Sequence, residues 1–431
     1  MDVREEVLGI ARAAKEASSA LACASEQERN AALAAMAEAL RAHAGEIEAA
    51  NAADMEAARA AGTKDSLLDR LMLDAGRIED MASALEDLIA LPDPLGCVQV
   101  HRELYNGIDL TRVSVPLGVV AMVYEARPNV TADAAGICVK SGNACVLRGG
   151  SLALRSCEAI AQVLAEAVAS TGLPKDAICI VATADRAATD ALMELRGVVD
   201  VLIPRGGAGL IQHCVEHAKV PVIETGTGNC HVYVHETADL AMARRIVENA
   251  KCRRFGVCNA AETLLVDRSI AQEFLPETLA MLASHEVALH CDETAYACAE
   301  QAASAAEVRF DHATEYDWET EYLGPEIAVK CVSGPDEAIA HINRYGTKHS
   351  EAIVANPEDA AGAAAIEAFL ARVDAAAVYA NASTAFTDGG QFGMGAEIGI
   401  STQKLHARGP FALEALTSYK YVLRGAGQVR A

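Results

Sequence analysis

The sequence predicts an α/β protein in which helices cover parallel β-sheets. Hydrophobic residues make up 52% of the chain and aromatic residues only 4%, a balance typical of Ala- and Val-rich helices packed on buried parallel strands. Apolar runs of strand length alternate with helical periods after the first quarter of the chain, as in β-α-β units. A chain of 431 residues exceeds one ordinary core, so we expect two or three domains.

Charge and cysteine content argue against several classes of function. The net charge of −24 would repel nucleic acid and anionic membranes over most of the surface. The thirteen cysteines show neither C-x-x-C pairs nor zinc-ligand spacing, which favours free thiols in a reducing compartment and predicts no structural metal. The charged first residues precede no signal-peptide core, and no run reaches transmembrane length. We therefore expect a cytoplasmic protein.

The first 92 or so residues follow a helical period, and amphipathic helices that cover one face of a sheet account for them. Pro92 and Pro94 then end the helical stretch. The next segment, VQVHRELYNGIDLTRVSVPLG, holds two alternating runs joined at Asn106-Gly107, which is a strong hairpin signal. Because an isolated hairpin is marginally stable, this one needs a packing partner from its own domain or from another subunit.

A β-α-β unit follows the hairpin. Val119 to Tyr124 predicts a buried strand and Ala144 to Leu147 a second one. Side chains that follow a strand end face the ligand crevice of an open parallel sheet. After the first strand, the amide of Asn129 can donate to an oxyanion or cap the following helix. After the second, Arg148 with the hydroxyl of Ser151 suits the 2′-phosphate of NADP; an arginine facing solvent is the alternative.

A glycine-rich turn follows the strand VDVLIP and opens a helix. The backbone N–H groups of Gly206 and Gly207 can approach a pyrophosphate in such a turn. The turn lacks the G-x-G-x-x-G pattern because Gln212 fills the last position. An ordinary helix start is therefore the alternative interpretation.

Cys258 is the candidate nucleophile. It ends the glycine-containing loop of NAKCRRFGVCNAAETLLV and precedes an apolar, strand-like run. At the N-terminus of a helix or turn, backbone N–H dipoles favour thiolate over thiol. A small buried thiol is the alternative. Upstream, PVIETGTGNCHVYV predicts a strand that ends on Glu224, a glycine-spaced turn and a second strand.

This arrangement of a strand-end Glu224, a glycine-rich turn and a later cysteine loop resembles the aldehyde dehydrogenase superfamily. Five further motifs are similar to the gamma-glutamyl phosphate reductases within it, and together they span nearly the whole chain. They are YEARPNVTADAAG, KSGNACVLRGG, VCNAAETLLV, NAST and STQKLHARGP.

The resemblance implies an aldehyde dehydrogenase-like fold and a reaction. NADPH would reduce L-glutamyl 5-phosphate to L-glutamate 5-semialdehyde and phosphate, a step of proline biosynthesis. The Cys258 thiolate would attack the acyl phosphate and form a thioester. The amide of Asn129 and the backbone N–H of Cys258 would form the oxyanion hole. Glu224 corresponds to the glutamate that activates water in oxidising relatives.

Binding roles also follow from the resemblance. Glu321, in EYLGP, is similar to the glutamate that holds the nicotinamide ribose; a solvated Glu before a turn is the alternative. Asn381, Ser383 and Thr384 offer polar groups for an amino-acid head group. Arg127 is a candidate for the phosphate of the substrate, with a structural role as the alternative.

The implied organisation has three parts. Residues 1–97 and 117–225 would form the cofactor domain and residues 226–405 the catalytic domain. Residues 98–116 and 406–431 would form an oligomerisation hairpin and C-terminal strand. The implied partners are further copies of the chain and, by functional coupling, glutamate 5-kinase.

Three positions depart from the family pattern. Ala385 stands where an arginine is usual, and Arg253 and Phe255 stand where glutamine and proline are usual, so the substrate contact and the shape of the cysteine loop can differ. Two alternative functions also remain: an oxidising, hydrolytic aldehyde dehydrogenase, and a non-catalytic scaffold of the same fold.

Overall fold

The computed structural model describes residues 2–125, 127–303 and 307–430. By its internal contacts the chain divides into two compact units, which we call the first and the second unit. The first unit comprises Met1–Thr225, Met394–Gly399 and Phe411–Ala431. The second unit comprises Gly226–Gly393 and Ile400–Pro410. Both units are α/β, so the predicted fold class is confirmed.

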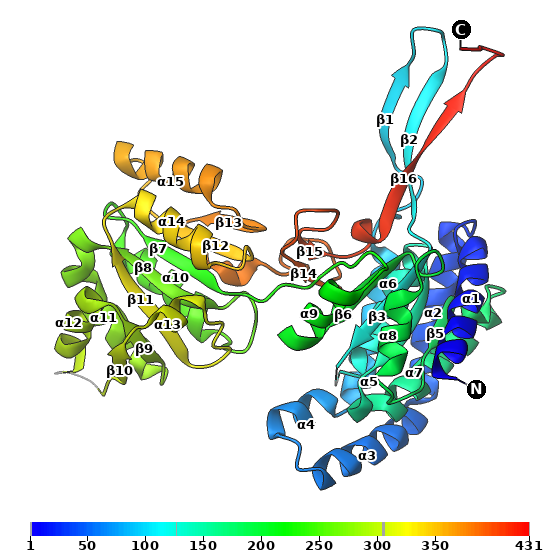
Figure 1. Cartoon of the computed structure of the whole chain (residues 1–431), viewed down its shortest axis with the longest axis horizontal. Helices are drawn as coiled ribbons and strands as arrows, with labels where there is room; N and C mark the ends of the chain where they lie inside the picture. Colours follow the sequence, from blue (N-terminus) through cyan, green and yellow to red (C-terminus); the bar gives the residue numbers. More distant parts are fainter. Residues whose placement is uncertain (1, 126, 304–306, 431) are drawn as a thin grey trace. The chain divides into compact units, whose positions relative to one another are not determined.

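The first unit is built on a four-stranded parallel sheet with the strand order β5-β4-β3-β6 (Figure 1). The strands are β3 (Val119–Tyr124), β4 (Ala144–Gly149), β5 (Ile178–Ile180) and β6 (Val201–Arg205). The helices are α1 (Val3–Leu21), α2 (Glu26–Ala42), α3 (Ala44–Ala60), α4 (Asp65–Leu71), α5 (Ala75–Ala90), α6 (Asn129–Lys140), α7 (Leu154–Ser170), α8 (Ala187–Glu194) and α9 (Ala208–His217).

Helices cover both faces of this sheet. Right-handed crossovers place α6 and α7 on one face and α8 on the other, because the chain reverses its direction across the sheet after β5. Helix α1 packs beside α8, and α2, α3 and α5 cover α6 and α7 as an outer layer. A Cβ at Gly136 would overlap Leu85, so this glycine lets α5 and α6 approach closely. The helical prediction for the first 92 residues is thus confirmed.

A separate antiparallel sheet has the order β1-β2-β16. It consists of β1 (Val98–Glu103), β2 (Asp109–Pro116) and β16 (Thr417–Arg424). The C-terminal strand pairs with β2 from Thr417 opposite Pro116 to Arg424 opposite Asp109. The predicted hairpin, and its closure by the C-terminal strand, are therefore confirmed. Most side chains of β1 and β16 are exposed.

The second unit is built on a seven-stranded parallel sheet with the order β10-β9-β11-β8-β7-β12-β13 (Figure 1). The strands are β7 (Cys230–Val234), β8 (Ala261–Asp267), β9 (Ala288–Cys291), β10 (Phe310–His312), β11 (Glu326–Val332), β12 (Ser350–Val354) and β13 (Ala377–Ala380). The helices are α10 (Leu240–Cys252), α11 (Ala271–Ser284), α12 (Glu293–Ala303), α13 (Glu315–Glu319), α14 (Pro335–Tyr345) and α15 (Ala360–Arg372). Two short strands, β14 (Gly399–Ser401) and β15 (Gly409–Phe411), pair with each other.

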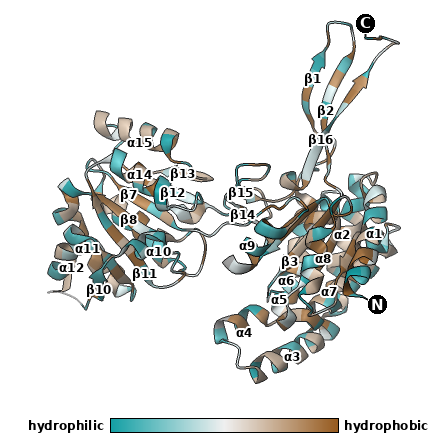
Figure 2. Ribbon diagram, viewed as in Figure 1, coloured by the Kyte–Doolittle hydropathy of each residue, from teal (hydrophilic) through white to brown (hydrophobic). Residues whose placement is uncertain are grey.

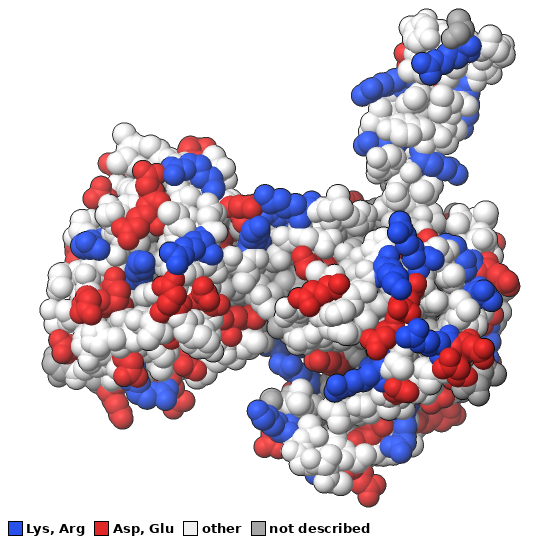
Figure 3. All heavy atoms as spheres, viewed as in Figure 1, with Lys and Arg blue, Asp and Glu red and all other residues white. Residues whose placement is uncertain are grey.

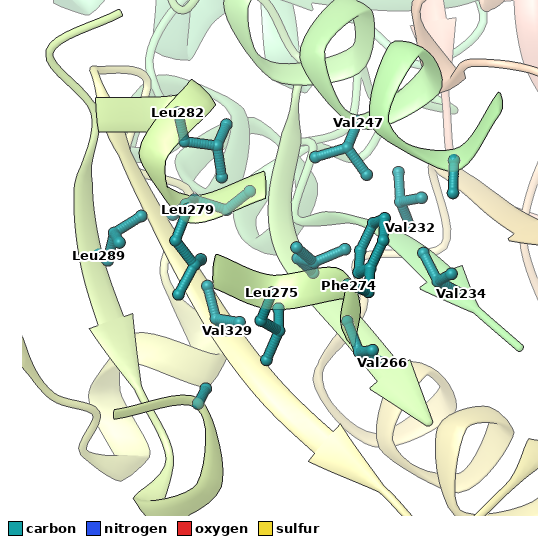
Figure 4. Packing of buried hydrophobic residues seen from close by; sticks show 14 of the residues in the cluster. Val232, Val234, Val247, Val266, Phe274, Leu275, Leu279, Leu282, Leu289 and Val329 are labelled. Carbon is teal, nitrogen blue, oxygen red and sulfur yellow. The ribbon is translucent and has the colours of Figure 1, made fainter. Parts of the chain in front are cut away.

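Two apolar layers hold the second unit together. Helices α10, α11 and α12 pack one face of the sheet through a cluster that includes Val232, Val247, Phe274, Leu279 and Val329 (Figure 4). Helices α14 and α15 pack through a second cluster that contains Phe369. Figure 2 shows mainly hydrophobic residues along the central strands of the sheet and both hydrophobic and hydrophilic residues on the helices around them. Strands buried on both faces are typical of parallel sheets.

One predicted strand is wrong. Residues 221–224 form only an isolated bridge between Val222 and Leu202, with Leu202 donating to Pro221 and Ile223 donating to Leu202. The ladder ends there in part because Pro221 has no N–H to donate. Glu224 therefore lies in an extended loop and not at the end of a named strand.

Within the described segments, no helix combines the length and apolarity needed to cross a bilayer. The same segments contain no group of three or more His, Cys, Asp or Glu side chains arranged to hold a metal ion.

Candidate active site

The backbone around Cys258 is held from three sides within the second unit. Cys258 lies in a turn closed by the N–H of Ala260, which donates to the carbonyl of Val257 at 3.1 Å. The buried thiol of Cys230 donates to the carbonyl of Cys258 at 3.2 Å. A Cβ at Gly228 would overlap that same carbonyl, so only glycine fits there. The Cys258 side chain itself is half-buried, which suits a nucleophile on a fixed loop.

Asn259 and Thr384 link the cysteine loop to the NAST segment. The Asn259 amide donates to the carbonyls of Ala385 at 3.3 Å and Thr387 at 3.0 Å. The Thr384 hydroxyl donates to the carbonyl of Asn259 at 2.7 Å. Both side chains are buried. Sequence analysis missed this link, although Asn259 directly follows the candidate nucleophile.

The other NAST residues are also engaged inside the second unit. Asn381 has a left-handed φ of 57°, and its Oδ1 accepts the N–H of Ala355 at 3.0 Å. Ser383 is buried, and its hydroxyl accepts the N–H of Ala385 at 3.2 Å. The departure at Ala385 therefore leaves the local backbone contacts in place. The Asn381 amide nitrogen is the group of this segment best suited to a ligand, because the oxygen is already used.

Glu321 lies next to the cysteine loop. Its Oε1 accepts the N–H of Gly228 at 2.6 Å. Burial raises the pKa of Glu321, and the hydrogen bond from Gly228 opposes that rise. Because Gly228 also abuts Cys258, one glycine brings Glu321 and the candidate nucleophile together. Glu321 is thus not a solvated residue before a turn.

In the first unit, Asn129 is the first residue of α6 and its side chain is exposed. Its Nδ2 donates to Asp133 one turn later, at 3.1 Å. The cap position of α6 is Pro128, which makes no side-chain hydrogen bond. The alternative of a capping asparagine is therefore wrong. Burial raises the pKa of Asp133 to about 6, against the opposing effects of Asn129 and Arg205.

Arg148 is buried at the end of β4, with 9% of its surface exposed. Its Nη2 is 3.4 Å from the carbonyl oxygens of Ala184 and Asp185, and its Nε has no hydrogen-bond partner among the described residues. Burial is the main cause that lowers its pKa, and the charge of Arg186 adds to it. The alternative of an arginine facing solvent is therefore wrong. A buried cation bonded to carbonyl oxygens is suited to bind an anion. Ser151 is exposed and begins a 3-10 turn directly after β4.

Gly206 and Gly207 form the turn before α9, as predicted, but a carboxylate already occupies it. The N–H of Gly207 donates to Oε2 of Glu125 at 3.0 Å, and a Cβ at Gly206 would lie 2.7 Å from the Glu125 carboxyl carbon. Glu125 follows β3 and had no role in the sequence analysis. A pyrophosphate bound at these N–H groups would displace it.

Glu224 and Arg127 belong to the first unit as well. Glu224 is half-buried in the loop that follows the bridge to β6, and Arg127 is exposed between β3 and α6. The first unit therefore holds Arg127, Asn129, Arg148, Ser151, Gly206, Gly207 and Glu224. The second holds Cys258, Glu321, Asn381, Ser383 and Thr384.

Comparison with known proteins places the chain in a family. The sequence model of the aldehyde dehydrogenase family matches residues 2–315. A gamma-glutamyl phosphate reductase of Moorella thermoacetica is 52% identical over 431 residues, which cover 100% of both chains. The chain belongs to the aldehyde dehydrogenase family and, within it, to the gamma-glutamyl phosphate reductases.

Two further relatives agree with this membership. A gamma-glutamyl phosphate reductase of Symbiobacterium thermophilum is 53% identical, with both chains fully covered. The crystal structure of gamma-glutamyl phosphate reductase from Thermotoga maritima is 45% identical, with a TM-score of 0.94 over 99% of this chain and 100% of the other. The resemblance to the gamma-glutamyl phosphate reductases is confirmed.

Proposed function

We propose that the protein reduces L-glutamyl 5-phosphate to L-glutamate 5-semialdehyde with NADPH, through a thioester on Cys258, as a step of proline biosynthesis. The observation that carries this proposal is the identity of about one half, over the whole length, to proteins named gamma-glutamyl phosphate reductase. The fixed backbone and half-buried thiol of Cys258 support the covalent step. A non-catalytic scaffold has no need for such a loop.

The protein contributes the nucleophile, hydrogen-bond donors to the oxyanion and the positioning of the reactants. The Cys258 thiolate attacks the acyl carbon of the substrate, the C–O bond to phosphate breaks, and inorganic phosphate leaves. Negative charge then develops on the acyl oxygen, and we assign the Asn129 amide and the Cys258 N–H as its donors; one such donor contributes about 3 kcal/mol. When bound, NADPH supplies the hydride that reduces the thioester to the aldehyde level. The C–S bond of the resulting tetrahedral species then breaks, which releases the aldehyde and returns Cys258 as the thiolate.

The residues of the first unit suit a nicotinamide cofactor with a 2′-phosphate. Arg148 offers a buried cation with an unpartnered Nε, and Ser151 offers an exposed hydroxyl one turn away. We assign these two side chains to the 2′-phosphate and the Gly206-Gly207 N–H groups to the pyrophosphate. In the second unit we assign Glu321 to the nicotinamide ribose.

For the substrate, we assign the Asn381 amide nitrogen and the NAST backbone to the amino-acid head group, with Ser383 and Thr384 holding that segment in shape. Arg127 is assigned to the leaving phosphate. The role of Glu224 as a base for water belongs to the rival, hydrolytic function. In the reductase we give Glu224 no step.

The test is the dependence on phosphate of the reverse reaction. With glutamate semialdehyde and NADP, a reductase must pass its thioester to inorganic phosphate, so NADPH formation rises with phosphate concentration. An oxidising dehydrogenase passes it to water activated by Glu224. Full-rate turnover in phosphate-free buffer would establish the hydrolytic function. Repeating the assay with Glu224→Gln separates the two, since only the hydrolytic enzyme loses its turnover.

We also propose that the β1-β2-β16 sheet mediates homo-oligomerisation. Its exposed apolar side chains include Val98, Tyr419, Tyr421 and Leu423, each at least half exposed, and contiguous apolar surface marks interaction sites. Its strands also carry more basic residues than acidic ones, although the protein as a whole is acidic. The basic residues are Arg102, Arg112, Lys420 and Arg424, and the acidic ones are Glu103 and Asp109. Figure 3 shows this excess of blue on the projecting sheet. Tyr419→Asp with Tyr421→Asp should give a smaller species in light scattering, with an unchanged circular dichroism spectrum.

A coupled kinase follows from the chemistry of the substrate. An acyl phosphate hydrolyses readily, so the enzyme that makes it, a glutamate 5-kinase, is the proposed functional partner.

The reducing cytoplasm is the proposed compartment, which the thirteen free cysteines support.

A further inference from the structure

Lys251 and Glu262 form an ion pair in the interior of the second unit. Lys251 lies in the last turn of α10 and Glu262 near the start of β8. Their side chains are 0% exposed, and Nζ lies 2.5 Å from Oε2. Burial raises the pKa of Glu262 to about 7 and lowers the pKa of Lys251, against the attraction between the two charges. Desolvation makes such a pair costly, so its presence calls for a role besides stability.

The second oxygen of Glu262 holds a strained loop. Its Oε1 accepts the N–H of Leu323 at 3.2 Å. Leu323 has a φ of 52°. Residues other than Gly, Asn and Asp rarely adopt this left-handed backbone conformation. The backbone there keeps this conformation only if its surroundings impose it. The Glu262 carboxylate is the group that bonds it.

Lys251 contacts the residue before Leu323. Its Nζ lies 6.0 Å from the centroid of the Tyr322 ring, within reach of a cation–π interaction. The other face of the loop is fixed by Tyr322 itself, whose ring stacks on His290 at 5.2 Å and whose hydroxyl donates to Asp317 at 3.0 Å. Both charges of the pair therefore act on residues 322 and 323.

The next residue upstream is Glu321, whose carboxylate accepts the N–H of Gly228, and Gly228 abuts the backbone of Cys258. Glu262 itself follows Cys258 by one short turn of chain. The contacts thus form a closed path from Cys258 along the chain to Glu262, across to Leu323, back to Glu321, and through Gly228 to Cys258.

We propose that Lys251 and Glu262 are positioning residues, which hold the loop of Glu321 in register with the loop of Cys258. Being fully buried, neither touches substrate or cofactor. Lys251 orients the carboxylate, and the carboxylate sets the conformation of Leu323 and so the direction of Glu321. The part that concerns cofactor affinity rests on the proposed function of Glu321; the part that concerns Cys258 does not.

The test compares two double variants. Lys251→Met with Glu262→Leu removes both charges and the acceptor for Leu323. Lys251→Met with Glu262→Gln removes the charges but keeps an oxygen for that N–H. We expect the first to weaken NADPH binding about tenfold and the second about threefold, as for lost interactions to a bound group. The matched control is Arg244→Met with Glu277→Gln, a more exposed ion pair that joins α10 to α11, which should change neither readout.

Two readouts separate positioning from general stability. Fluorescence titration gives the NADPH affinity of the full-length protein, and mass spectrometry gives the rate of alkylation of Cys258 by iodoacetamide, with exposed Cys97 as internal reference. We expect the Cys258 rate to change in the first variant while the Cys97 rate does not. In a Glu321→Gln background, the effect of either variant on NADPH affinity should shrink to less than about twofold, because coupled residues are not additive.

The outcomes are decisive in each direction. A folded first variant with unchanged NADPH affinity and an unchanged Cys258 rate would overturn the proposal. Equal losses of affinity with and without Glu321→Gln would assign the pair to stability alone. If the first variant fails to fold, the same cycle run on the second variant decides the matter. Because alkylation needs no substrate, a failure of the proposed reaction leaves this test intact.

Discussion

The N–H of Gly207 at the start of α9 is bonded to the carboxylate of Glu125 at 3.0 Å. A helix N-terminus binds anions because its N–H groups are unpaired and its dipole is positive there. A glutamate therefore stands where the proposed cofactor needs to place its pyrophosphate. If the pyrophosphate binds there as proposed, it replaces the carboxylate of Glu125 at this N–H group.

Replacing Glu125 should consequently strengthen cofactor binding. Glu125→Gln removes the charge that competes for the turn, and we expect NADPH to bind about threefold more tightly, within the range of charge effects at helix termini. Glu216→Gln, at the other end of α9, is the control and should have no effect. Fluorescence titration at two salt concentrations measures the NADPH affinity of each variant. Weaker binding in Glu125→Gln would show that the carboxylate helps to hold the cofactor.

Arg148 should discriminate between the two nicotinamide cofactors. Arg148→Ala removes a charge-assisted contact worth about 1.5–3 kcal/mol to a phosphate that only NADPH carries. NADPH affinity should therefore fall by more than about tenfold while NADH affinity changes little. Arg12→Ala, an exposed position on α1, serves as control. Equal losses of affinity for NADPH and NADH would show that Arg148 does not bind the 2′-phosphate.

Thr384 should matter for the shape of the cysteine loop. Thr384→Val keeps the volume but leaves the buried carbonyl of Asn259 without its donor, which costs about 1–3 kcal/mol of unfolding free energy. Thr384→Ser keeps the hydroxyl and should recover most of that loss. Denaturant unfolding and the rate of Cys258 alkylation measure the two effects. If valine and serine behave alike, the hydroxyl contributes nothing to the loop.

Much of the fold follows from local patterns. The helices up to Ala90, the hairpin at Asn106-Gly107 and strands β3 and β4 all have clear periods or turn signals. The strand predicted before Glu224 did not form, because an apolar pattern does not show that Val222 pairs with Leu202 in a single bridge only. A local sequence pattern describes the propensity to form a strand, whereas the length of the hydrogen-bonded ladder depends on the neighbouring strand.

The site was partly predictable for a similar reason. Cys258 and Glu321 stand in ordered motifs, and the structure places them around one glycine, Gly228. Glu125 and the pair of Lys251 and Glu262 carry no motif, because their roles depend on which loops meet in three dimensions. A charged residue in an apolar strand, such as Glu262 in β8, was a sequence signal that could have indicated the buried ion pair.

Within the first unit, the strand ends of β3, β4 and β6 bring Glu125, Arg148 and Gly207 to one edge of the sheet, where α/β proteins bind ligands. Within the second, the backbone of Gly228 contacts both the candidate nucleophile Cys258 and the carboxylate of Glu321. These two sets of groups are the parts that the proposed reaction needs, and each can be tested in its own unit.

The central claim is the thioester on Cys258, and its most direct test omits phosphate. Mixed with glutamate semialdehyde and NADP alone, the enzyme should release about one NADPH per active site and then stop, because the acyl group has no acceptor. Mass spectrometry should find a glutamyl adduct on the Cys258 peptide, and Cys258→Ala should show neither burst nor adduct. An adduct on another cysteine, or steady NADPH formation without any adduct, would contradict the account.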